Sequence, residues 1–598
     1  MIETFSKIFD LLDARERRNF FLLVGASLLL GLVEAVGVLS ILPFIAVASN
    51  PDAIAQSEIL STIYDALGFE STQAFLIALG VAVFGVLLGG ISLRTVTFYG
   101  LTRFGRMRAL SIGRKLLHRY LSQPYAWHLN RHTARLSTRV LSEVQQVVDG
   151  SIVSAMQLIA HIAVTLCIVA LLFAVEPLAA LVVGGTLCAA YGLVFLGVRR
   201  WLLRLGQTKV EANAQRFRVT QEALAGIKDV KLLGLEEPYL GRFSSATGRF
   251  ARVKATQSLI NELPRNALEA LTFGAMILFV LWVLATRQGN MIEALPILGL
   301  YAFAGVRLFP TLQKLYSTFA RVRFGKPALD ALHADLMAPI EGEVVAPSSG
   351  PSLRLRESLE LDDVVYKFAA ADRPALAGLS LRIDARTTVG IVGSTGAGKT
   401  TAVDVMLGLL TPQEGEMRVD GVMVDGSNVR DWQRSVGYVP QSIYLLDDTV
   451  AANIAFGQKG RSIDRAAVER AARIAKLHDF VTELPRGYDT LVGERGARLS
   501  GGQRQRVGIA RALYRDPDVL VFDEATSALD NLTEKAVMEA IEELGREKTV
   551  VMIAHRLTTV RRCDVIFYLE AGRVVASGSY DELLGTSTRF RELHEAVG

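Results

Sequence analysis

Apolar residues are concentrated before about residue 320, where they form long continuous stretches instead of an alternating pattern. A helix needs about 20 apolar residues to cross the ~30 Å hydrocarbon core of a bilayer. Stretches that approach this length occur at residues 21–48, 74–98, 152–174, 178–198, 267–285 and 294–316. The pattern therefore predicts an α-helical membrane bundle of six transmembrane helices over residues 21–325.

The loops between these stretches differ in charge, which predicts the orientation of the spans. The segment 49–72 contains acidic residues but no Lys or Arg, whereas the connections 101–150 and 199–262 are rich in basic residues. Basic loops remain on the cytoplasmic side of a membrane. We therefore expect a multi-pass protein of the inner (plasma) membrane with both termini in the cytoplasm.

Helical patterns continue outside the predicted spans. Residues 1–20 alternate apolar and charged positions, which predicts an amphipathic elbow helix on the inner membrane surface. The cytoplasmic connections predict long helical extensions, interrupted near residues 123–128 and 225–230. In the outer loop, apolar residues at helical spacing predict a helix near 54–67. That helix either caps the span ends or rests on the outer leaflet near a lipid substrate.

Four charged residues lie inside predicted spans, where charge is costly and therefore suggests function. They are Glu34, Arg94, Arg265 and Arg307. Ion pairs that hold the bundle together would explain them, with Glu34 or Glu269 as the acid. Three arginines on different helices are also suited to line a cavity and to hold a phosphate, because guanidinium binds phosphate in bidentate fashion. The sequence leaves both interpretations open.

Composition supports a membrane protein of more than one domain. The chain has 598 residues, 51% of them hydrophobic, which is long for one domain and apolar for a soluble protein. Its net charge of +5 is modest, and basic residues cluster beside apolar segments. They are expected to orient the chain in a membrane and not to bind nucleic acid. The three cysteines form no disulfide framework.

After a linker at residues 326–352, the pattern changes to strands alternating with helices over residues 353–598. An apolar strand at 388–392 precedes a glycine-rich loop, and a helical pattern follows it. Glycines allow backbone N–H groups to surround phosphates, and the helix N-terminus favours negative charge. In such a loop the lysine neutralises phosphate charge and the next hydroxyl binds Mg²⁺. The predicted nucleotide-binding residues are Gly393, Ser394, Thr395, Gly396, Ala397, Gly398, Lys399, Thr400 and Thr401.

Two acidic residues follow a second apolar strand at residues 519–522. Asp523 is predicted to hold Mg²⁺ together with Thr400, and Glu524 is placed to activate water as general base. Adjacent acids after a strand are common, so this assignment depends on the glycine-rich loop. Together the two motifs predict hydrolysis of ATP with Mg²⁺ as cofactor.

Further motifs resemble those of ATP-binding cassette (ABC) proteins. The run Leu499-Ser500-Gly501-Gly502-Gln503 resembles the ABC signature motif, Gln441 the Q-loop glutamine, Ser527-Ala528-Leu529-Asp530 the D-loop and His555 the switch histidine. Phe368 stands where the family usually has a tyrosine that stacks on adenine, and a phenylalanine can stack in the same way. With the preceding spans, the chain resembles a half-size ABC exporter (type IV) that carries an α/β P-loop nucleotide-binding domain.

This resemblance implies a domain-swapped homodimer, in which the signature loop of one subunit closes on ATP bound to the other. It implies that Gln441 and His555 act in catalysis and that Gln441 also contacts the metal. It further implies that Ser500, Gly501, Gly502 and Gln503 bind ATP across the interface. The chain contains one copy of each motif and all of them are intact, which favours a homodimer over a heterodimer with one degenerate site.

The membrane half resembles PglK-type lipid-linked oligosaccharide flippases. The resemblance rests on Glu34-Ala35-Val36-Gly37, on Tyr120-Leu121-Ser122-Gln123-Pro124-Tyr125, on Leu263-Pro264-Arg265 with Glu269, and on residues 304–310 with Arg307. It implies a polyprenyl-pyrophosphate-linked oligosaccharide as substrate. Arg94, Arg265 and Arg307 would hold the pyrophosphate, and residues 54–67 would contact the lipid tail.

Three alternatives share some of these motifs. An exporter of lipid A, peptide or hydrophobic drugs would carry the same cassette. An ATP-gated channel or receptor would carry it too but would not pump. Soluble ABC ATPases that act in DNA repair or translation are disfavoured by the apolar half of the chain.

Overall fold

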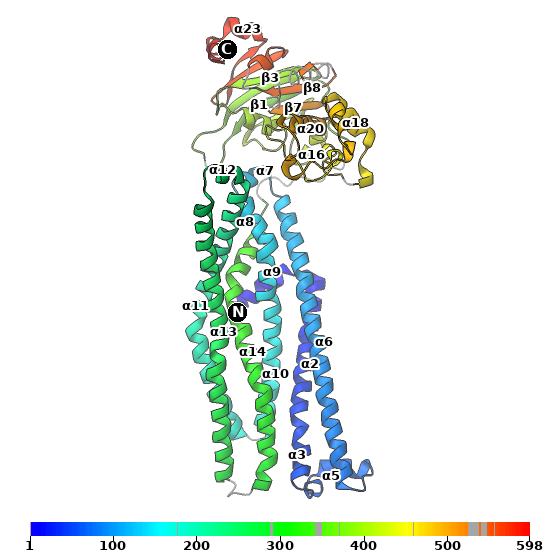
Figure 1. The fold of residues 1–598 in the computed structure, drawn as a ribbon, viewed down its shortest axis with the longest axis vertical. Coiled ribbons are helices and arrows are strands. Elements are labelled where there is room, and N and C mark those ends of the chain that lie inside the picture. Colours follow the sequence, from blue (N-terminus) through cyan, green and yellow to red (C-terminus); the bar gives the residue numbers. More distant parts are fainter. Residues whose placement is uncertain are drawn as a thin grey trace. The chain divides into compact units, whose positions relative to one another are not determined.

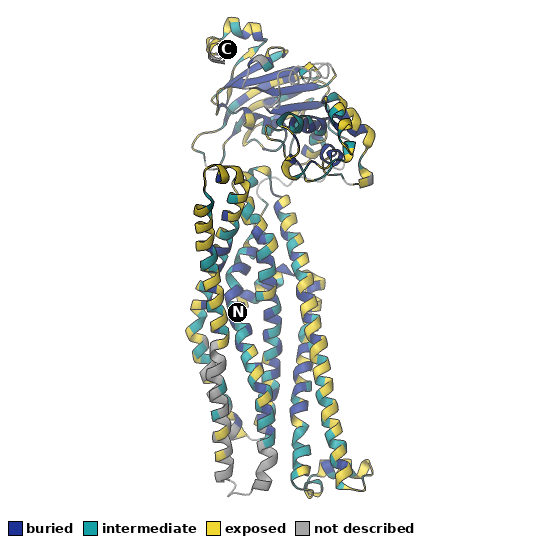
Figure 2. Ribbon diagram, viewed as in Figure 1, coloured by how far each residue is buried: buried dark blue, intermediate teal, exposed yellow. Residues whose placement is uncertain are grey.

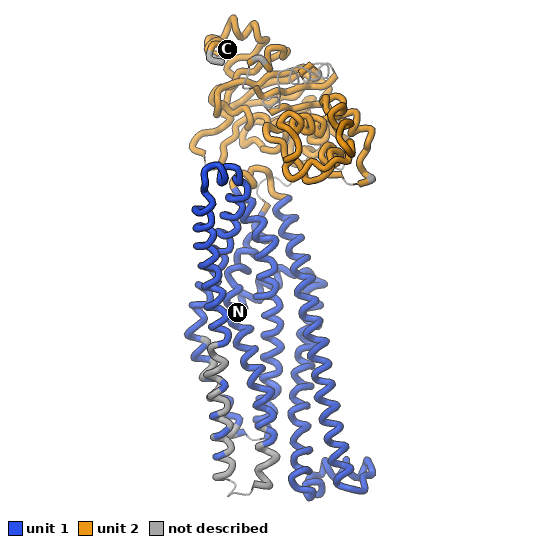
Figure 3. Tube along the Cα trace, viewed as in Figure 1, with its two compact units in different colours: residues 1–121, 131–339 blue, residues 122–130, 340–598 orange. Residues whose placement is uncertain are grey.

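The computed structural model describes residues 2–175, 177–286, 291–340, 350–369, 371–458, 460–523, 538–539, 547–554 and 557–597, with some side chains, mostly between 178 and 301, outside the description. The chain divides into two compact units, residues 1–121 with 131–339 and residues 122–130 with 340–598 (Figure 3). The short segment 122–130 therefore packs with the second unit, although it interrupts the first in sequence.

The first unit consists of helices (Figure 1). Its main helices are α1 (Ile2–Leu11), α2 (Ala14–Leu39), α3 (Ile41–Ser49), α6 (Thr72–Leu121), α10 (Ser154–Val175), α11 (Pro177–Ala225), α13 (Glu236–Thr286) and α14 (Met291–Met337). Among the described residues, Ala14–Ser49, Thr72–Leu121 and Thr133–Val175 are long and apolar enough to cross a membrane. The other predicted spans fall on α11, α13 and α14, where many side chains lie outside the description, and they remain predictions.

Shorter helices join these long ones. They are α4 (Ala53–Gln56), α5 (Glu58–Ala66), α8 (Thr133–Thr138), α9 (Val144–Val147) and α12 (Ile227–Leu232), with π-helical turns at η1 (Arg139–Glu143) and η2 (Val148–Val153). The chain thus leaves regular α-helix near both predicted interruptions. It does so at residues 122–124, before α7 (Tyr125–Leu129) of the second unit, and at Gly226 before α12.

The first predicted span is not one continuous helix. α2 ends at Leu39 and α3 begins at Ile41, with Ser40 between them. Pro43 has no N–H to donate to the Leu39 carbonyl, and its ring clashes with that carbonyl in a straight helix. The Ser40 hydroxyl donates to the Gly37 carbonyl at 2.9 Å and satisfies one of the carbonyl groups at the break.

The predicted outer helix at 54–67 is divided into α4 and α5. The Ser57 hydroxyl accepts a hydrogen bond from the Leu60 amide at 3.4 Å and so caps α5. Leu60 is buried with Val47 and Phe75, which ties α5 to the ends of α3 and α6. Ile59, Ile63 and Leu67 remain exposed at four-residue spacing. α5 thus both covers the helix ends and presents an apolar stripe outward.

The N-terminal helix α1 contacts the C-terminal part of α14 through charged side chains. Acidic and basic residues spaced by three or four positions face each other on the two helices. The pairs are Glu3 with Lys326 at 2.9 Å, Lys7 with Asp330 at 2.7 Å, and Asp10 with His333 at 3.0 Å. The regular spacing places each set on one helix face, so that α1 is fixed along α14.

A buried polar cluster lies where α6 and α14 end. The Tyr120 hydroxyl donates to Asp335 Oδ2 at 2.5 Å, and the Arg139 guanidinium forms an ion pair with the same carboxylate. Glu143, one turn after Arg139, lies 3.9 Å from its Nε. Burial raises the pKa of Glu143. The cluster therefore joins α6, η1 and α14 within a few residues of the points where the chain leaves the first unit.

Replacing Arg139 with methionine is expected to destabilise the first unit by about 3–5 kcal/mol, because the Asp335 carboxylate would stay buried without its cation. Thermal unfolding of the purified protein in lipid discs measures this loss. Arg135→Met on the neighbouring exposed turn is the matched control. Equal melting temperatures for the two variants would contradict the buried ion pair.

The buried side chain of Lys209 on α11 is expected to make the stability of the folded protein depend on pH. Its side chain is only 6% exposed, and its ammonium lies 5.0 Å from the centroid of the Phe324 ring. Burial lowers the Lys209 pKa to about 7, with a smaller contribution from the charge of Lys254. A lowered pKa means that the unfolded chain binds the proton more tightly. The free energy of unfolding is therefore highest above the ordinary lysine pKa, where Lys209 is neutral in both states. It decreases as the pH falls towards 7, because the unfolded chain takes up the proton first.

We expect Lys209→Met to raise the melting temperature at pH 7 and to flatten its dependence on pH between about 7 and 10. Lys254→Met, which removes an exposed ammonium, should leave that dependence nearly unchanged. Melting curves measured across this pH range test the prediction. An unchanged slope in Lys209→Met would show that Lys209 is not the titrating group.

The second unit contains two sheets. The antiparallel sheet has the order β2-β1-β4-β5, from β1 (Ser358–Tyr366), β2 (Leu376–Asp384), β4 (Glu414–Val419) and β5 (Val422–Met423). The other sheet has the order β10-β9-β3-β8-β7-β6. Its strands are β3 (Thr388–Gly393), β6 (Val436–Val439), β7 (Val519–Asp523), β8 (Thr549–Ile553), β9 (Val565–Glu570) and β10 (Arg573–Gly578).

The central strands of the six-stranded sheet are buried on both faces. β3, β7 and β8 are buried at every position, as Figure 2 shows for this sheet. The ladders joining β6, β7, β8, β3 and β9 are parallel, and only β10 runs antiparallel to its neighbour. Continuous apolar strands suit this position because neither face meets water.

Candidate functional site

The parallel order of the sheet brings the predicted nucleotide-binding motifs to one edge. The glycine-rich loop follows β3, Gln441 follows β6, and Asp523 ends β7. Asp523 pairs with Ile553 at the end of β8, and Val439 pairs with Phe522. In open α/β sheets, ligands bind outside the carboxyl ends of the strands. Segments that are distant in sequence therefore meet where a nucleotide would bind.

The glycine-rich loop has a backbone that requires glycine at two positions. Gly393 has φ +154° and Gly398 has φ +101°, and an added Cβ would lie 2.2 Å from the Leu569 carbonyl oxygen and 2.6 Å from that of Ala375. The Gly572 amide donates to the Ala397 carbonyl at 3.0 Å and holds the loop from the other side. A Cβ on Gly396 would meet nothing within 4 Å, so the turn of the loop opens onto free space.

Lys399 begins helix α15 (Lys399–Met406) directly after this loop. Its side chain is buried, and Nζ donates to the Gly393 carbonyl at 2.7 Å and to the Ser394 carbonyl at 3.1 Å. These bonds bend the ammonium back over the loop, where phosphate oxygens would lie. Ser394, Thr395 and Gly396 are exposed. The loop thus presents backbone amides and one buried cation to an incoming anion, as phosphate binding requires.

The same edge fits a magnesium ion bound together with phosphate. Thr400 is exposed at the helix start, and the Asp523 carboxylate accepts a hydrogen bond from the Tyr438 hydroxyl at 3.3 Å. Among the described residues, no group of three His, Cys, Asp or Glu side chains could form a metal site of protein ligands alone. Mg²⁺ commonly takes one or two carboxylates and completes its shell with phosphate and water.

The sequence analysis missed two side chains beside Asp523. Asp404 lies on α15, and Tyr438 lies on β6 three residues before Gln441. Burial, together with the negative charge of Asp523, raises the pKa of Asp404 to about 6. An acid in the helix that follows the glycine-rich loop was a visible signal, but nothing in the sequence placed it next to Asp523.

The signature motif forms the start of helix α20 (Gly501–Leu513). The Ser500 hydroxyl accepts from the Gln503 amide at 3.2 Å, and the Ser500 amide donates to Gln503 Oε1 at 2.8 Å. This capping box fixes the turn at Gly501 and Gly502. Later in α20, Arg511 donates to the Tyr444 carbonyl at 2.8 Å. The signature helix is therefore tied to the loop after Gln441.

Of the remaining predicted site residues, some are described by the structure and others are not. Phe368 packs edge-on against Tyr366 with ring centroids 5.0 Å apart, just after β1. Gln441 is exposed after β6. Glu524, His555 and the D-loop 527–530 lie outside the described residues, as does the side chain of Arg265.

In the membrane half, Arg94 pairs with Glu34. The Arg94 Nε lies 2.9 Å from Glu34 Oε1, and the Glu34 side chain is buried. Of the two interpretations of these residues, this geometry matches the ion pair within the bundle. Arg307 instead lies 5.8 Å from the Phe303 ring centroid and forms no ion pair with any described acid.

Arg307 is the first of three basic residues at seven-residue spacing on α14, followed by Lys314 and Arg321. Seven residues make nearly two helical turns, so the three share one face. Arg321 Nε is buried without a hydrogen-bond partner among the described residues. The spacing was visible in the sequence but lay partly beyond the predicted span.

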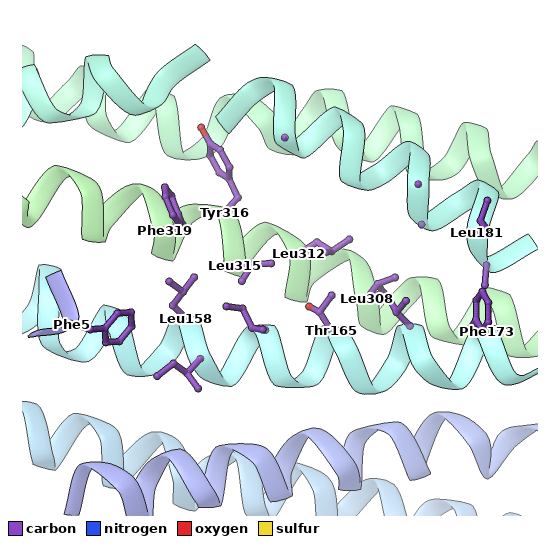
Figure 4. A pocket seen from close by; sticks show the side chains of 17 residues that line it. Phe5, Leu158, Thr165, Phe173, Leu181, Leu308, Leu312, Leu315, Tyr316 and Phe319 are labelled. Carbon is purple, nitrogen blue, oxygen red and sulfur yellow. The ribbon is translucent and has the colours of Figure 1, made fainter. Parts of the chain in front are cut away.

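An apolar cavity of ≈ 850 Å³ lies between α10, α11 and α14. Figure 4 shows Leu158 and Thr165 of α10 facing Leu312 and Leu315 of α14, with Phe5 of α1 at one end. On α14, the lining positions fall on a different face from the three basic residues. The helix therefore separates an apolar face from a cationic one.

Two family models match the chain. The ABC transporter model covers residues 376–527, and the ABC transporter transmembrane region covers residues 39–293. An ATP-dependent lipid A-core flippase of Cupriavidus metallidurans is 34% identical over 507 residues, which are 83% of each chain. The heterocyst differentiation ATP-binding protein HepA of Nostoc sp. is 33% identical over 394 residues, 64% of this chain and 62% of that protein.

A solved structure, that of a bacterial Atm1-family ABC exporter with ATP bound, superposes with a TM-score of 0.77 at 26% identity. The match covers 94% of this chain and 98% of the other. The expected fold, a helical transmembrane region fused to an ABC nucleotide-binding domain, is thereby confirmed. From the glycine-rich loop, the order of the sheet and these relatives together, the chain belongs to the ABC transporter family as a half-size exporter that couples ATP hydrolysis to transport.

Proposed function

We propose that this chain forms a homodimeric flippase that moves a phosphate-bearing lipid across the inner membrane, with its ATPase domains in the cytoplasm. The observation that carries the proposal is the cationic face of α14 together with the apolar cavity on another face of the same helix. A lipid with an anionic head group needs both kinds of surface, because burying its charge without a partner is costly.

The ATP site supplies the driving reaction. Lys399 and the loop amides bind phosphate, and Phe368 packs against the adenine. Thr400, Gln441 and Asp523 would hold Mg²⁺, which neutralises phosphate charge when bound. Glu524 takes the proton of the attacking water, and His555 contacts the phosphate that is released. Each chain has one phosphate loop and one signature helix, so a second copy completes each site with Ser500, Gly501, Gly502 and Gln503.

The cationic face offers successive positions to a head group. An α-helix rises about 1.5 Å per residue, so Arg307, Lys314 and Arg321 are spaced by about 10 Å along α14. The buried Arg321 Nε lacks a hydrogen-bond partner among the described residues, and a phosphate oxygen would satisfy it. Arg94 is held by Glu34 and contributes to the field of this region, while the side chain of Arg265 remains a prediction.

The apolar cavity suits lipid chains. Its volume of ≈ 850 Å³ is near the upper end of the ~300–1,000 Å³ found for ligand pockets, and its described lining is almost entirely hydrocarbon and aromatic. Alkyl chains would fill this space without leaving polar groups unpaired. The exposed stripe of Ile59, Ile63 and Leu67 on α5 offers a further apolar contact on the outer side of the membrane.

Among phosphate-bearing lipids, we favour a polyprenyl-pyrophosphate-linked oligosaccharide. The apolar stripe of α5 supports a long lipid tail that extends beyond the cavity. Lipid A-core is the second candidate, because several of the similar proteins are named flippases of that lipid. Both lipids carry phosphate, so the cationic face of α14 serves either one.

The test is ATP hydrolysis and lipid flipping by the full chain in liposomes, with each of the two lipids, with a neutral glycolipid and with a hydrophobic cation. We expect one phosphate lipid to stimulate hydrolysis and to be flipped. In Arg307→Ala/Lys314→Ala, stimulation should be lost while basal hydrolysis persists. Arg218→Ala, an exposed arginine on the cytoplasmic part of α11, is the matched control.

Stimulation by lipid A-core and not by the polyprenyl-pyrophosphate glycan would select the second candidate. Stimulation by the hydrophobic cation would overturn the lipid assignment. Equal responses of the wild type, Arg307→Ala/Lys314→Ala and Arg218→Ala would overturn it too. The ABC exporter assignment would stand in either case. Flux that continues without hydrolysis would instead indicate a channel.

A further inference from the structure

The short helix α7 (Tyr125–Leu129) belongs to the nucleotide-binding unit by its contacts. Ala126 packs against the core that contains Tyr366 and the strand residues of β1 and β3. Trp127 and Gln123 are buried. The segment 122–130 thus packs as part of the nucleotide-binding unit. Its two ends continue in sequence into α6 and α8 of the helical unit.

Four polar side chains from four different elements interact electrostatically. They are Tyr125 of α7, Asp404 of α15, Tyr438 of β6 and Asp523 of β7. Burial raises the pKa of both tyrosine hydroxyls, and the negative charge of Asp404 raises the pKa of each one further. The hydrogen bond from Tyr438 to Asp523 Oδ2 at 3.3 Å connects the group to the candidate metal acid.

The register of the sheet accounts for this bond. Tyr438 pairs with Val521 in the parallel ladder of β6 and β7. Side chains two residues apart point to the same face of a strand, so Val521 and Asp523 share a face. Asp523 lies two residues beyond Val521 on β7. A long side chain at position 438 can therefore reach the Asp523 carboxylate. Phenylalanine would fill the same space but could not donate the hydrogen bond.

We propose that Tyr438 is a positioning residue that holds the Asp523 carboxylate in the orientation needed for magnesium. The hydroxyl fixes one carboxylate oxygen and thereby selects the side-chain rotamer. This inference rests on the proposed role of Asp523 as a metal ligand.

The experiment measures binding of Mg²⁺ to the nucleotide-loaded full chain in lipid discs, with a fluorescent ATP analogue as reporter. We expect Tyr438→Phe to weaken Mg²⁺ binding about tenfold, the lower end for loss of a group that orients a metal ligand. Binding of the analogue without metal, and the melting temperature, should stay unchanged. Tyr444→Phe, an exposed tyrosine in the loop after Gln441, is the matched control.

Unchanged Mg²⁺ affinity in Tyr438→Phe would overturn the positioning role. Unchanged affinity in Asp523→Asn would show instead that the proposed metal ligand is wrong.

Discussion

Replacing Lys399 with alanine is expected to lower ATP hydrolysis by about 10²–10³-fold, the range found when one preorganised donor that stabilises a charged transition state is removed. The buried ammonium is held over the glycine-rich loop by the carbonyls of Gly393 and Ser394. Alanine leaves these carbonyls turned toward the phosphates with no cation between them. Nucleotide binding should weaken as well, because the same charge acts on the ground state.

Phosphate release by the purified chain and equilibrium binding of a fluorescent ATP analogue measure the two effects. Lys548→Ala is the matched control, since Lys548 pairs with Asp516 at 2.6 Å at the opposite end of the sheet. Hydrolysis at the wild-type rate in Lys399→Ala would show that the glycine-rich loop is not the catalytic phosphate site.

Replacing Glu524 with glutamine is expected to reduce turnover by about 10²–10⁴-fold, the range that general base catalysis contributes. Asp523 ends β7 at the nucleotide edge, and Glu524 is the next residue in the sequence. A glutamine amide has nearly the shape of the carboxylate but cannot take a proton from water. In contrast to Lys399→Ala, this variant should still bind ATP and should accumulate as a closed dimer.

Single-turnover hydrolysis, ATP binding and cross-linking between subunits distinguish the two variants. Glu570→Gln is the matched control because Glu570 ends β9 in the same sheet. Loss of ATP binding in Glu524→Gln would assign the residue to binding and not to proton transfer. Normal turnover would exclude it as the general base.

Much of the nucleotide edge could be predicted from the sequence because its motifs are local. The glycine-rich loop, the Ser500 cap and the acid after β7 each depend on residues within about eight positions of one another. Backbone geometry forces such choices, as at Gly393 and Gly398, where a side chain would collide with the backbone carbonyls of Leu569 and Ala375. The apolar stretches were equally readable, because burial in a bilayer sets their length.

Contacts between distant segments could not be predicted in this way. Arg94 and Glu34 were both recognised, but only packing of α2 against α6 shows that they pair. Tyr438 and Asp404 carried no motif, and the ladder of β6 and β7 brings Tyr438 to Asp523. The cluster of Tyr120, Arg139 and Asp335 likewise joins residues about 200 positions apart.

The sequence by itself determined the family, the membrane character and the ATP chemistry, because these depend on composition and on short-range backbone geometry. Only the tertiary structure decided that Glu34 neutralises Arg94, whereas Arg307 on α14 forms no ion pair with a described acid. The physical reason is that the electrostatic role of a side chain depends on neighbours supplied by other elements, and chain folding alone brings these together.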